Sequence, residues 1–175
     1  MKLSLNLLVV MALSKPSLRS LMKTQLKEVT SNEIKRQSTT LFRKIVDEMN
    51  VVSSDSVLCI FISMNNEIDT SDMIHHFLTC GHKLYIPKVT GKLPQDMVMY
   101  PVKNIEELQN FPKNKWGIPE PPLDLLNNAN IDNCADIDVV FMPGVAFDKK
   151  CNRIGHGRGY YGMMNALYYI VYANV

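Results

Sequence analysis

The sequence lacks the features of several common protein classes. It contains no run of five or more Lys or Arg residues, and its formal net charge is only +2. A chain this close to neutral has no general electrostatic attraction for nucleic acid, so we expect no nucleic-acid partner. No Gly-Lys-Ser or Gly-Lys-Thr sequence is present, which excludes a P-loop nucleotide site.

Cysteine is also scarce. The four cysteines, at positions 59, 80, 134 and 151, are far apart and form no CxxC pair. This favours reduced thiols in a cytosolic protein over a disulfide framework or a metal cluster. His75 and His76 are adjacent, so on a helix they point about 100° apart and do not chelate one ion. We therefore expect no metal site built from these side chains.

The apolar stretch at residues 3–13 is too short to span a membrane, and we expect no membrane partner. With Met1 and Lys2 before it, the stretch resembles the start of a signal peptide, but no small-x-small cleavage site follows. We expect residues 1–14 to form an N-terminal extension and residues 15–175 a single domain. The expected location is cytoplasmic, with mitochondria or secretion as the alternatives, and the expected state is a monomer.

Apolar patterning indicates that strands and helices alternate along the chain. Continuous or β-branched apolar runs predict strands at 56–64, 83–89, 97–102, 138–142 and 167–172. Helical spacing and capping residues predict helices at 17–27, 30–49, 70–80, 105–110 and from 159 onward. Residues 111–124, with four prolines, are expected to form a loop. The alternation predicts an α/β fold, a Rossmann-like three-layer sandwich with a mostly parallel sheet that binds ligands beyond the carboxyl ends of its strands.

The most informative segment is the glycine loop, which we define as residues 152–162 (NRIGHGRGYYG). Glycine occupies every second position from 155 to 159, which is more glycine than a tight turn requires. Arg153, His156 and Arg158 place positive or protonatable groups between and beside these glycines. Backbone N–H groups interleaved with cations bind phosphate. The loop therefore predicts a nucleotide site, although its spacing and late position differ from a dinucleotide-binding fingerprint.

Four further residues each admit two interpretations. Lys15 and Arg19, at the start of a predicted helix, are either solvated charges or ligands of an anion. Glu67 follows a buried strand and is either a loop carboxylate or an acceptor for paired N–H groups of a ligand. Trp116 is the only tryptophan and either belongs to the core or stacks on a flat heterocycle.

Together these segments resemble the 5-formyltetrahydrofolate cyclo-ligases, also called methenyltetrahydrofolate synthetases. The resemblance runs from residue 15 to residue 161. It rests on KPSLR at 15–19, FISMNNEI at 61–68, WGIPEP at 116–121, FMPGVAFD at 141–148 and the glycine loop.

The resemblance implies a ligase of folate and one-carbon metabolism. Such enzymes use ATP and Mg²⁺ to convert 5-formyltetrahydrofolate to 5,10-methenyltetrahydrofolate, with release of ADP and phosphate. The formyl oxygen attacks the γ-phosphate, N10 closes the ring, and phosphate leaves. This chemistry depends on in-line positioning and neutralised phosphate charge more than on acid–base groups.

Carried onto this sequence, the resemblance implies a role for each candidate residue. Lys15 and Arg19 would contact the ATP phosphates. Ile62, Glu67 and Trp116 would line the folate pocket, with Glu67 holding the pterin. The expected catalytic cations are Arg153, His156 and Arg158. The expected ATP-binding residues of the loop are Arg153, Ile154, Gly155, His156, Gly157, Arg158, Gly159, Tyr160 and Tyr161, and those from His156 to Tyr160 are also expected to contact folate.

Three departures from the family pattern keep a second hypothesis open. His156 stands where the family usually has arginine, and histidine cannot bind phosphate bidentately. Gly162 stands where the family has an aspartate associated with Mg²⁺, and glycine offers no side-chain oxygen. The tail after Tyr161 does not resemble the family, so we expect the family's last strand segment to be absent. The alternatives are a truncated or catalytically impaired form that binds folate or nucleotide without turnover, and a product made unstable by an exposed sheet edge.

Overall fold

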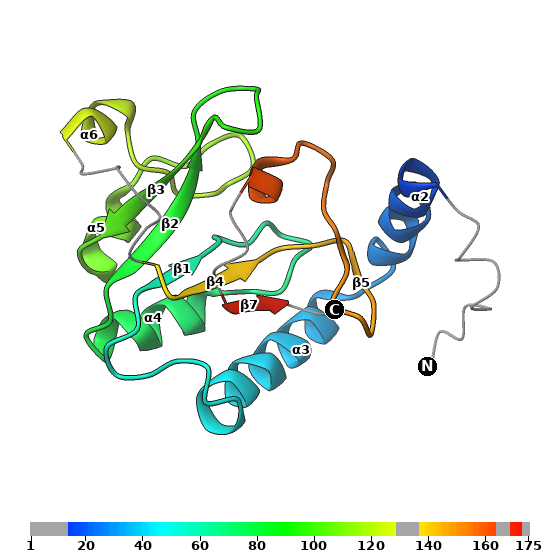
Figure 1. The fold of residues 1–175 in the computed structure, drawn as a ribbon, viewed down its shortest axis with the longest axis horizontal. Coiled ribbons are helices and arrows are strands. Elements are labelled where there is room, and N and C mark those ends of the chain that lie inside the picture. Colours follow the sequence, from blue (N-terminus) through cyan, green and yellow to red (C-terminus); the bar gives the residue numbers. More distant parts are fainter. Residues whose placement is uncertain (1–13, 129–136, 164–168, 173–175) are drawn as a thin grey trace.

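The computed structural model describes residues 14–128, 137–163 and 169–172 (Figure 1). The expected N-terminal extension, apart from Ser14, and Cys134 lie outside these residues. A five-stranded sheet in the order β3-β2-β1-β4-β7 forms the centre. The strands are β1 (Leu58–Ile60), β2 (Leu84–Val89), β3 (Met97–Val102), β4 (Val139–Met142) and β7 (Tyr169–Tyr172). Only β3 runs antiparallel to its neighbour, which confirms the expected mostly parallel α/β sheet.

Most of the helices follow the predicted order with shifted ends, but α6 was not predicted and begins within the loop expected at 111–124, and a 3₁₀ turn stands where a helix was expected from 159 onward. The α-helices are α2 (Lys15–Leu26), α3 (Ser31–Arg43), α4 (Ser71–Thr79), α5 (Ile105–Asn110) and α6 (Leu123–Asn128). Shorter elements are the π-helical turn η1 (Lys44–Glu48), the hairpin strands β5 (Ala146–Phe147) and β6 (Arg153–Ile154), and the 3₁₀ turn η3 (Tyr160–Met163). The β5–β6 hairpin is not predicted by the apolar pattern, because two-residue strands are too short to show a period.

The start of α3 shows how far the capping signal holds. The Thr30 hydroxyl accepts a hydrogen bond from the Glu33 backbone N–H at 3.2 Å, as the predicted capping box requires. The Glu33 carboxylate does not return to the cap. It accepts from the Arg36 guanidinium at 2.6 and 2.8 Å, and this contact lowers the pKa of Glu33 to about 2. One half of the capping box is therefore present.

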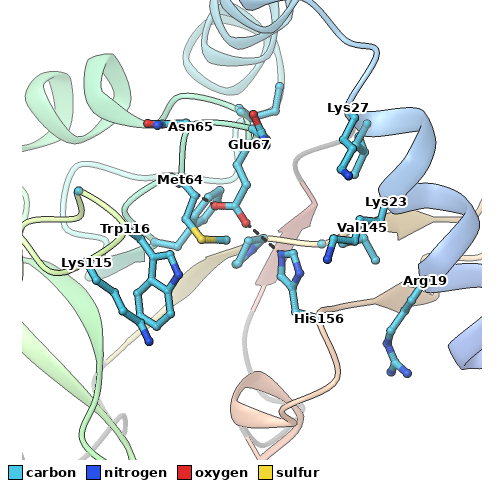
Figure 2. A pocket seen from close by; sticks show the side chains of 17 residues that line it. Arg19, Lys23, Lys27, Met64, Asn65, Glu67, Lys115, Trp116, Val145 and His156 are labelled. Carbon is cyan, nitrogen blue, oxygen red and sulfur yellow. Dashed lines mark hydrogen bonds and ion pairs between the residues drawn. The ribbon is translucent and has the colours of Figure 1, made fainter.

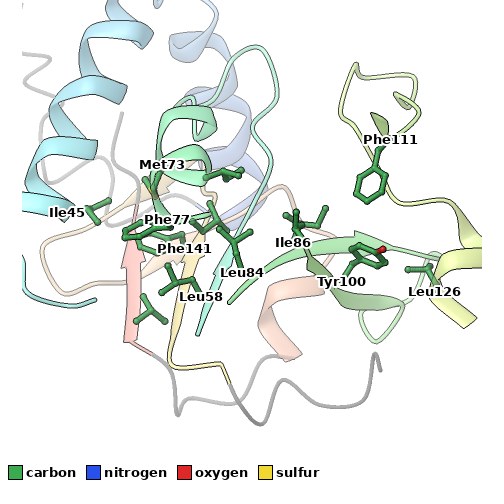
Figure 3. Close-up of a cluster of buried hydrophobic side chains, with 14 residues drawn as sticks. Ile45, Leu58, Met73, Phe77, Leu84, Ile86, Tyr100, Phe111, Leu126 and Phe141 are labelled. Atoms are coloured by element: carbon green, nitrogen blue, oxygen red, sulfur yellow. The ribbon is translucent and has the colours of Figure 1, made fainter. Parts of the chain in front are cut away.

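The main core lies on one face of the sheet, where α3, η1 and α4 cover it (Figures 1 and 3). Side chains of a strand alternate between faces, so alternate residues of β1, β2, β3 and β4 belong to this cluster. Leu58 and Ile60 of β1 are fully buried there and pack with Phe77 of α4 and Phe141 of β4. Replacing such a side chain with alanine typically costs about 2–5 kcal/mol of stability.

The opposite face of the sheet carries a second cluster. The intervening strand residues Cys59, Tyr85 and Val140 belong to it, and Tyr161 of η3 packs against it. Cys59 is fully buried, as the apolar run around it predicts. Burial also raises the pKa of Tyr161 well above its ordinary value. The end of the glycine loop therefore helps to cover this face.

The path of the chain through the sheet creates a switch point. From β1 the chain moves to β2 and β3 on one side, and it then crosses to β4 and β7 on the other. β1 and β4 are adjacent and parallel, with Leu58 paired to Val139 and Ile60 to Phe141. In open α/β sheets, ligands bind beyond the carboxyl ends of the two strands at such a point.

The tail after the glycine loop supplies a strand. β7 pairs in parallel with β4 along its whole length, from the pair Val139 and Tyr169 to the pair Met142 and Tyr172. β4 is therefore not an edge strand. Among the described helices, none is both long enough and apolar enough to cross a bilayer.

Candidate functional site

A cavity of about 710 Å³ lies at the carboxyl ends of β1 and β4, at the switch point of the sheet (Figure 2). Its walls come from the connections that follow these two strands, from α2, from the turn around Trp116 and from the glycine loop. The lining residues are Phe61 and 64–68 after β1, 143–145 after β4, Arg19, Lys23, Leu26 and Lys27 at α2, 115–117, and His156.

The glycine loop has the backbone geometry of an anion site. Gly157 and Gly159 have φ angles of +100° and +82°, which residues with a Cβ adopt only at a cost. Gly159 also packs against Pro94, whose Cγ is 3.3 Å from where a Cβ would lie. No backbone N–H group of residues 156–159 donates to an acceptor in the described part of the chain. These donors are therefore available to an anionic ligand.

Arg19 joins α2 to the glycine loop. Its Nε donates a hydrogen bond of 2.9 Å to the backbone oxygen of Gly155. Its guanidinium carbon is only 3.4 Å from where a Cβ would lie on Gly157. Two segments that the sequence predicted separately as phosphate ligands therefore meet. Lys15, one turn earlier on α2, is exposed and does not line the cavity.

Arg153 supports the loop from within. Its Nη1 donates a hydrogen bond of 2.6 Å to the backbone oxygen of Pro143, just beyond β4. Its guanidinium also lies over the ring of Tyr161, 5.4 Å from the ring centre. Arg153 thereby connects the glycine loop to the end of the sheet. Arg158, in contrast, is exposed to solvent.

Glu67 and His156 meet inside the cavity. Oε1 of Glu67 lies 3.5 Å from Nε2 of His156 (Figure 2). The second carboxylate oxygen of Glu67 accepts a hydrogen bond of 2.9 Å from the backbone N–H of Met64, which fixes the rotamer. The Glu67 side chain is 16% exposed, whereas that of His156 is 58% exposed. The carboxylate is therefore held in place while the imidazole faces the open side of the cavity.

Trp116 lies on the rim of the cavity. Its side chain is 57% exposed, so the interpretation as a core residue is wrong. The ammonium of Lys115 lies over the indole at 4.4 Å from the ring centre. Gly117 follows with a φ of +78° and turns the chain back. An exposed indole beside a cavity is suited to stacking on a flat ligand.

A polar cluster holds the Trp116 turn in shape. The side-chain oxygen of Asn114 accepts from the backbone N–H groups of Trp116 and Ile118 at 2.8 and 3.1 Å. The amide of Asn114 in turn donates to Glu120 at 2.5 Å. Glu120 also pairs with Lys88 of β2, and these two side chains are only 26% and 12% exposed. The turn is therefore anchored to the sheet by a largely buried ion pair.

His156 is the one residue of the glycine loop that lines the cavity, so the other predicted loop residues and Ile62 lie outside its lining. The Tyr160 hydroxyl donates a hydrogen bond of 2.9 Å to the backbone oxygen of Gly91, in the loop between β2 and β3. Tyr161 packs under the sheet, and Ile62 packs against the main core. These residues support the walls of the site.

Sequence reasoning missed several residues of the cavity. Lys23 and Lys27 follow Arg19 at steps of four residues, a spacing that marks one face of a helix and would have indicated them. Asn65 and Asn66 precede Glu67 directly in the connection expected to hold a ligand. No sequence pattern identifies Lys115 as a cavity residue, apart from its position next to Trp116.

The donor set does not fit a magnesium ion held by the protein. Gly162 has no side-chain oxygen, and the described residues contain no group of three or more His, Cys, Asp or Glu side chains placed to hold a metal. Mg²⁺ prefers one or two carboxylates together with water and phosphate oxygens. The Glu67 carboxylate is already engaged by Met64 and His156.

Comparison with known proteins agrees with this arrangement. The model of the 5-formyltetrahydrofolate cyclo-ligase family matches residues 11–168. The chain belongs to this family of ligases. It is 34% identical to a probable 5-formyltetrahydrofolate cyclo-ligase of Caenorhabditis elegans, over 84% of this chain and 70% of that protein. It is 30% identical to the 5-formyltetrahydrofolate cyclo-ligase of Mus musculus, over 85% of this chain and 71% of the relative.

Solved structures show the same fold for the cyclo-ligase chain. The 5,10-methenyltetrahydrofolate synthetase of Aquifex aeolicus superposes with a TM-score of 0.66 at 23% identity, covering 90% of this chain and 75% of the other. The synthetase of Mycoplasma pneumoniae superposes with a TM-score of 0.63 at 16% identity, covering 88% and 80%. The expected fold is therefore confirmed.

Proposed function

We propose that this cyclo-ligase converts 5-formyltetrahydrofolate to 5,10-methenyltetrahydrofolate, with hydrolysis of ATP to ADP and phosphate. One observation carries the proposal: a single cavity has His156 of the glycine loop and the loop-bound Arg19 on one side and Glu67 and Trp116 on the other. The two sides have different chemistry. One offers cations and backbone donors for phosphate, and the other offers a carboxylate and an indole for a flat heterocycle.

On the phosphate side, the glycine loop takes the triphosphate. Backbone N–H groups of residues 156–159 donate to its oxygens, and Arg19 and Arg158 neutralise their charge. His156 adds a donor between the two substrates. The role of Arg153 is to hold the loop against Pro143. Lys15 contributes charge at the start of α2.

On the folate side, Glu67 accepts paired N–H groups of the pterin, and Trp116 covers the ring. This arrangement presents the formyl oxygen to the γ-phosphate. Attack by that oxygen transfers the phosphoryl group, and ADP leaves. N10 then closes on the activated carbon, and the former formyl oxygen departs with phosphate. Positioning and charge neutralisation supply the rate enhancement.

Several further expectations accompany this proposal. Mg²⁺ is expected to bind together with ATP as its counter-ion, rather than as an ion held by protein side chains. Residues 15–175 are taken as one domain that acts as a monomer in the cytoplasm. The relative from Arabidopsis thaliana is described as mitochondrial, so that location is the alternative for this chain.

The direct test is an absorbance assay. 5,10-Methenyltetrahydrofolate absorbs in the near ultraviolet, so the purified chain with 5-formyltetrahydrofolate, ATP and Mg²⁺ should give a signal that grows only when ATP is present. Circular dichroism on the same sample checks that the protein is folded. A flat trace from folded protein would exclude turnover.

A second candidate function is binding of folate or nucleotide without turnover. It is favoured by Gly162, which gives the loop no oxygen ligand for a metal. Calorimetry that detects ATP or folate binding, together with no product in the absorbance assay, would support it. An unstable product is the third possibility, and a cooperative unfolding transition would argue against it.

A further inference from the structure

The connection between β2 and β3 packs against the end of the glycine loop. It comprises residues 90–96 (TGKLPQD), which we call the β2–β3 loop. The backbone oxygen of Gly91 accepts the 2.9 Å hydrogen bond from the Tyr160 hydroxyl. Pro94 lies against Gly159, with its Cγ 3.3 Å from where a Cβ would lie. Two residues of the β2–β3 loop therefore contact two neighbouring residues of the glycine loop.

The shape of the β2–β3 loop depends on Asp96. The Asp96 carboxylate accepts a hydrogen bond of 2.8 Å from the backbone N–H of Leu93. The backbone N–H of Asp96 donates to the Leu93 oxygen at 2.9 Å, and its oxygen accepts from the Thr90 N–H at 2.8 Å. The carboxylate also lies directly against Gly91, where a Cβ would collide with it. Aspartate side chains stabilise turns through such bonds to neighbouring backbone groups, so this carboxylate fixes the fold of the loop.

The glycine loop needs support at its far end. Near its start, Arg153 donates to a backbone oxygen beyond β4, and Arg19 donates to the Gly155 oxygen. Gly157 and Gly159 follow, and residues without a Cβ have wide conformational freedom. If a loop of this kind is ordered only when its ligand binds, the ordering lowers the affinity. The β2–β3 loop supplies order at the far end before any ligand arrives.

We propose that Asp96 is a positioning residue for the nucleotide. It lies outside the cavity lining, so its action is indirect. Through the β2–β3 loop, its carboxylate holds Gly159 and Tyr160 so that the backbone donors of residues 156–159 are arranged for the triphosphate. This inference rests on the proposed function. Without the carboxylate, ATP itself must order both loops, and its binding weakens.

The first test compares D96A and D96N in the absorbance assay. D96A should raise the KM for ATP about 5- to 10-fold, because the Leu93 N–H loses its acceptor. The KM for 5-formyltetrahydrofolate should stay at the wild-type value, since Glu67 and Trp116 belong to other connections. D96N keeps an acceptor oxygen and should recover most of the loss.

G91A reaches the same end without removing the carboxylate. The added Cβ displaces the Asp96 side chain from Gly91, so G91A should also raise the KM for ATP. In the G91A/D96A variant the methyl group has room, and its KM should equal that of D96A. If D96A does not fold, G91A carries the test.

The matched control is D55A. Asp55 is exposed and accepts a local hydrogen bond from the Ser54 hydroxyl. It precedes β1, at the opposite end of that strand from the cavity. D55A should keep the wild-type KM for both substrates.

A double-mutant cycle tests whether Asp96 acts through the glycine loop. Y160F removes the hydroxyl that donates to Gly91 and should raise the KM for ATP about 3- to 5-fold. Because both changes break the same connection, D96A/Y160F should have nearly the KM of D96A alone. Effects that multiply in the double variant would show that Asp96 acts elsewhere.

Three further results would overturn the inference. They are an unchanged KM for ATP in D96A and G91A, an equal rise of both KM values in D96A, and an effect of D55A as large as that of D96A. An equal rise of both KM values would indicate general destabilisation, which urea unfolding of the same variants measures.

Failure of the proposed function gives a different result. If the folded wild type shows no turnover, calorimetry measures the Kd for ATP in the same variants. A weaker Kd in D96A that D96N recovers would support the role of Asp96 in a chain that binds without turnover. An equal Kd in wild type and D96A, or no ATP binding by the wild type, would overturn the inference.

Discussion

Nε2 of His156 lies 3.5 Å from Oε1 of Glu67, and this pair links the glycine loop to the connection after β1. The two residues belong to the two sides of the cavity. In our proposal Glu67 binds the pterin and His156 binds the phosphates. Because the two side chains are in contact, the residue that binds one substrate touches the residue that binds the other. Changes at either residue should therefore alter the kinetics of both substrates.

Replacing His156 with arginine should strengthen ATP binding. A guanidinium is permanently charged and binds phosphate bidentately, which an imidazole does not. We expect H156R to lower the KM for ATP by about 3- to 10-fold, equivalent to about 1 kcal/mol of added binding. H156Q keeps a donor but no charge and should raise the KM. An identical KM for ATP in both variants would show that position 156 does not contact the nucleotide.

Removing the Arg19 side chain should disable the phosphate side. R19M loses both the hydrogen bond to the Gly155 oxygen and a cation beside the loop. Loss of charge-assisted hydrogen bonds worth about 3 kcal/mol would lower kcat/KM for ATP by about 100-fold. R19K should recover part of this loss, and R43M, at an exposed position of α3, should behave as wild type. A wild-type kcat/KM for ATP in R19M would show that Arg19 does not take part in ATP binding.

Breaking the pair between Lys88 and Glu120 should destabilise the Trp116 turn. K88M leaves the largely buried Glu120 without its cation, and we expect a loss of about 2 kcal/mol in the free energy of unfolding. The K88M/E120Q double variant should recover part of this loss. Urea unfolding measures stability, and Trp116 fluorescence measures the order of the turn. Additive losses in the double variant would mean that the two side chains do not interact.

The stability of the protein should fall at high pH because of Tyr100. Burial and the hydrogen bond of its hydroxyl to Glu107 raise the pKa of Tyr100 to about 12. In the unfolded chain the ordinary value is about 10. The neutral phenol therefore stabilises the folded state fully below pH 10, and this contribution is lost as the pH rises from 10 towards 12.

Urea unfolding of wild type and Y100F between pH 8 and 11 measures this effect. At pH 8, Y100F should be less stable by about 1–2 kcal/mol, because Glu107 loses a donor. By pH 11 the difference should shrink by about 1.4 kcal/mol, since one pKa unit corresponds to that amount. A difference that stays constant over this range would assign the high-pH loss to other groups.

The sequence predicts this fold well because its signals are local. The central strands are continuous apolar runs buried on both faces, the helices carry caps at Thr30 and Gly81, and both features depend on neighbouring residues. β1 nevertheless ends at Ile60, several residues before its apolar run does. The backbone oxygen of Phe61 accepts from the Thr70 hydroxyl at 2.7 Å, so the chain has already turned toward α4.

The candidate site was predictable in its members and less so in their roles. The glycine loop, Arg19, Glu67 and Trp116 each carry a motif, and the structure gathers Arg19, Glu67, Trp116 and His156 of the loop at one cavity. Arg153 was expected to face the phosphates. Its partner is the Pro143 oxygen, and no sequence pattern identifies a backbone acceptor ten residues away. The ion pair of Lys88 and Glu120 joins positions 32 residues apart, and a local sequence pattern does not predict it either.

The alignment of β1 with β4 has a mechanical consequence for the two substrates. Glu67 is carried by the connection after β1, while the glycine loop follows β4, and the two strands are locked by the pairing of Leu58 with Val139. A slip of one residue would displace the two connections by about 3.3 Å and turn every side chain of the slipped strand to the other face. Under the proposed function, the pairing of these two buried strands would therefore set the gap between the formyl oxygen and the γ-phosphate. Core residues such as Leu58 and Val139, which fix this pairing, would then control the distance between the reacting atoms without touching either substrate.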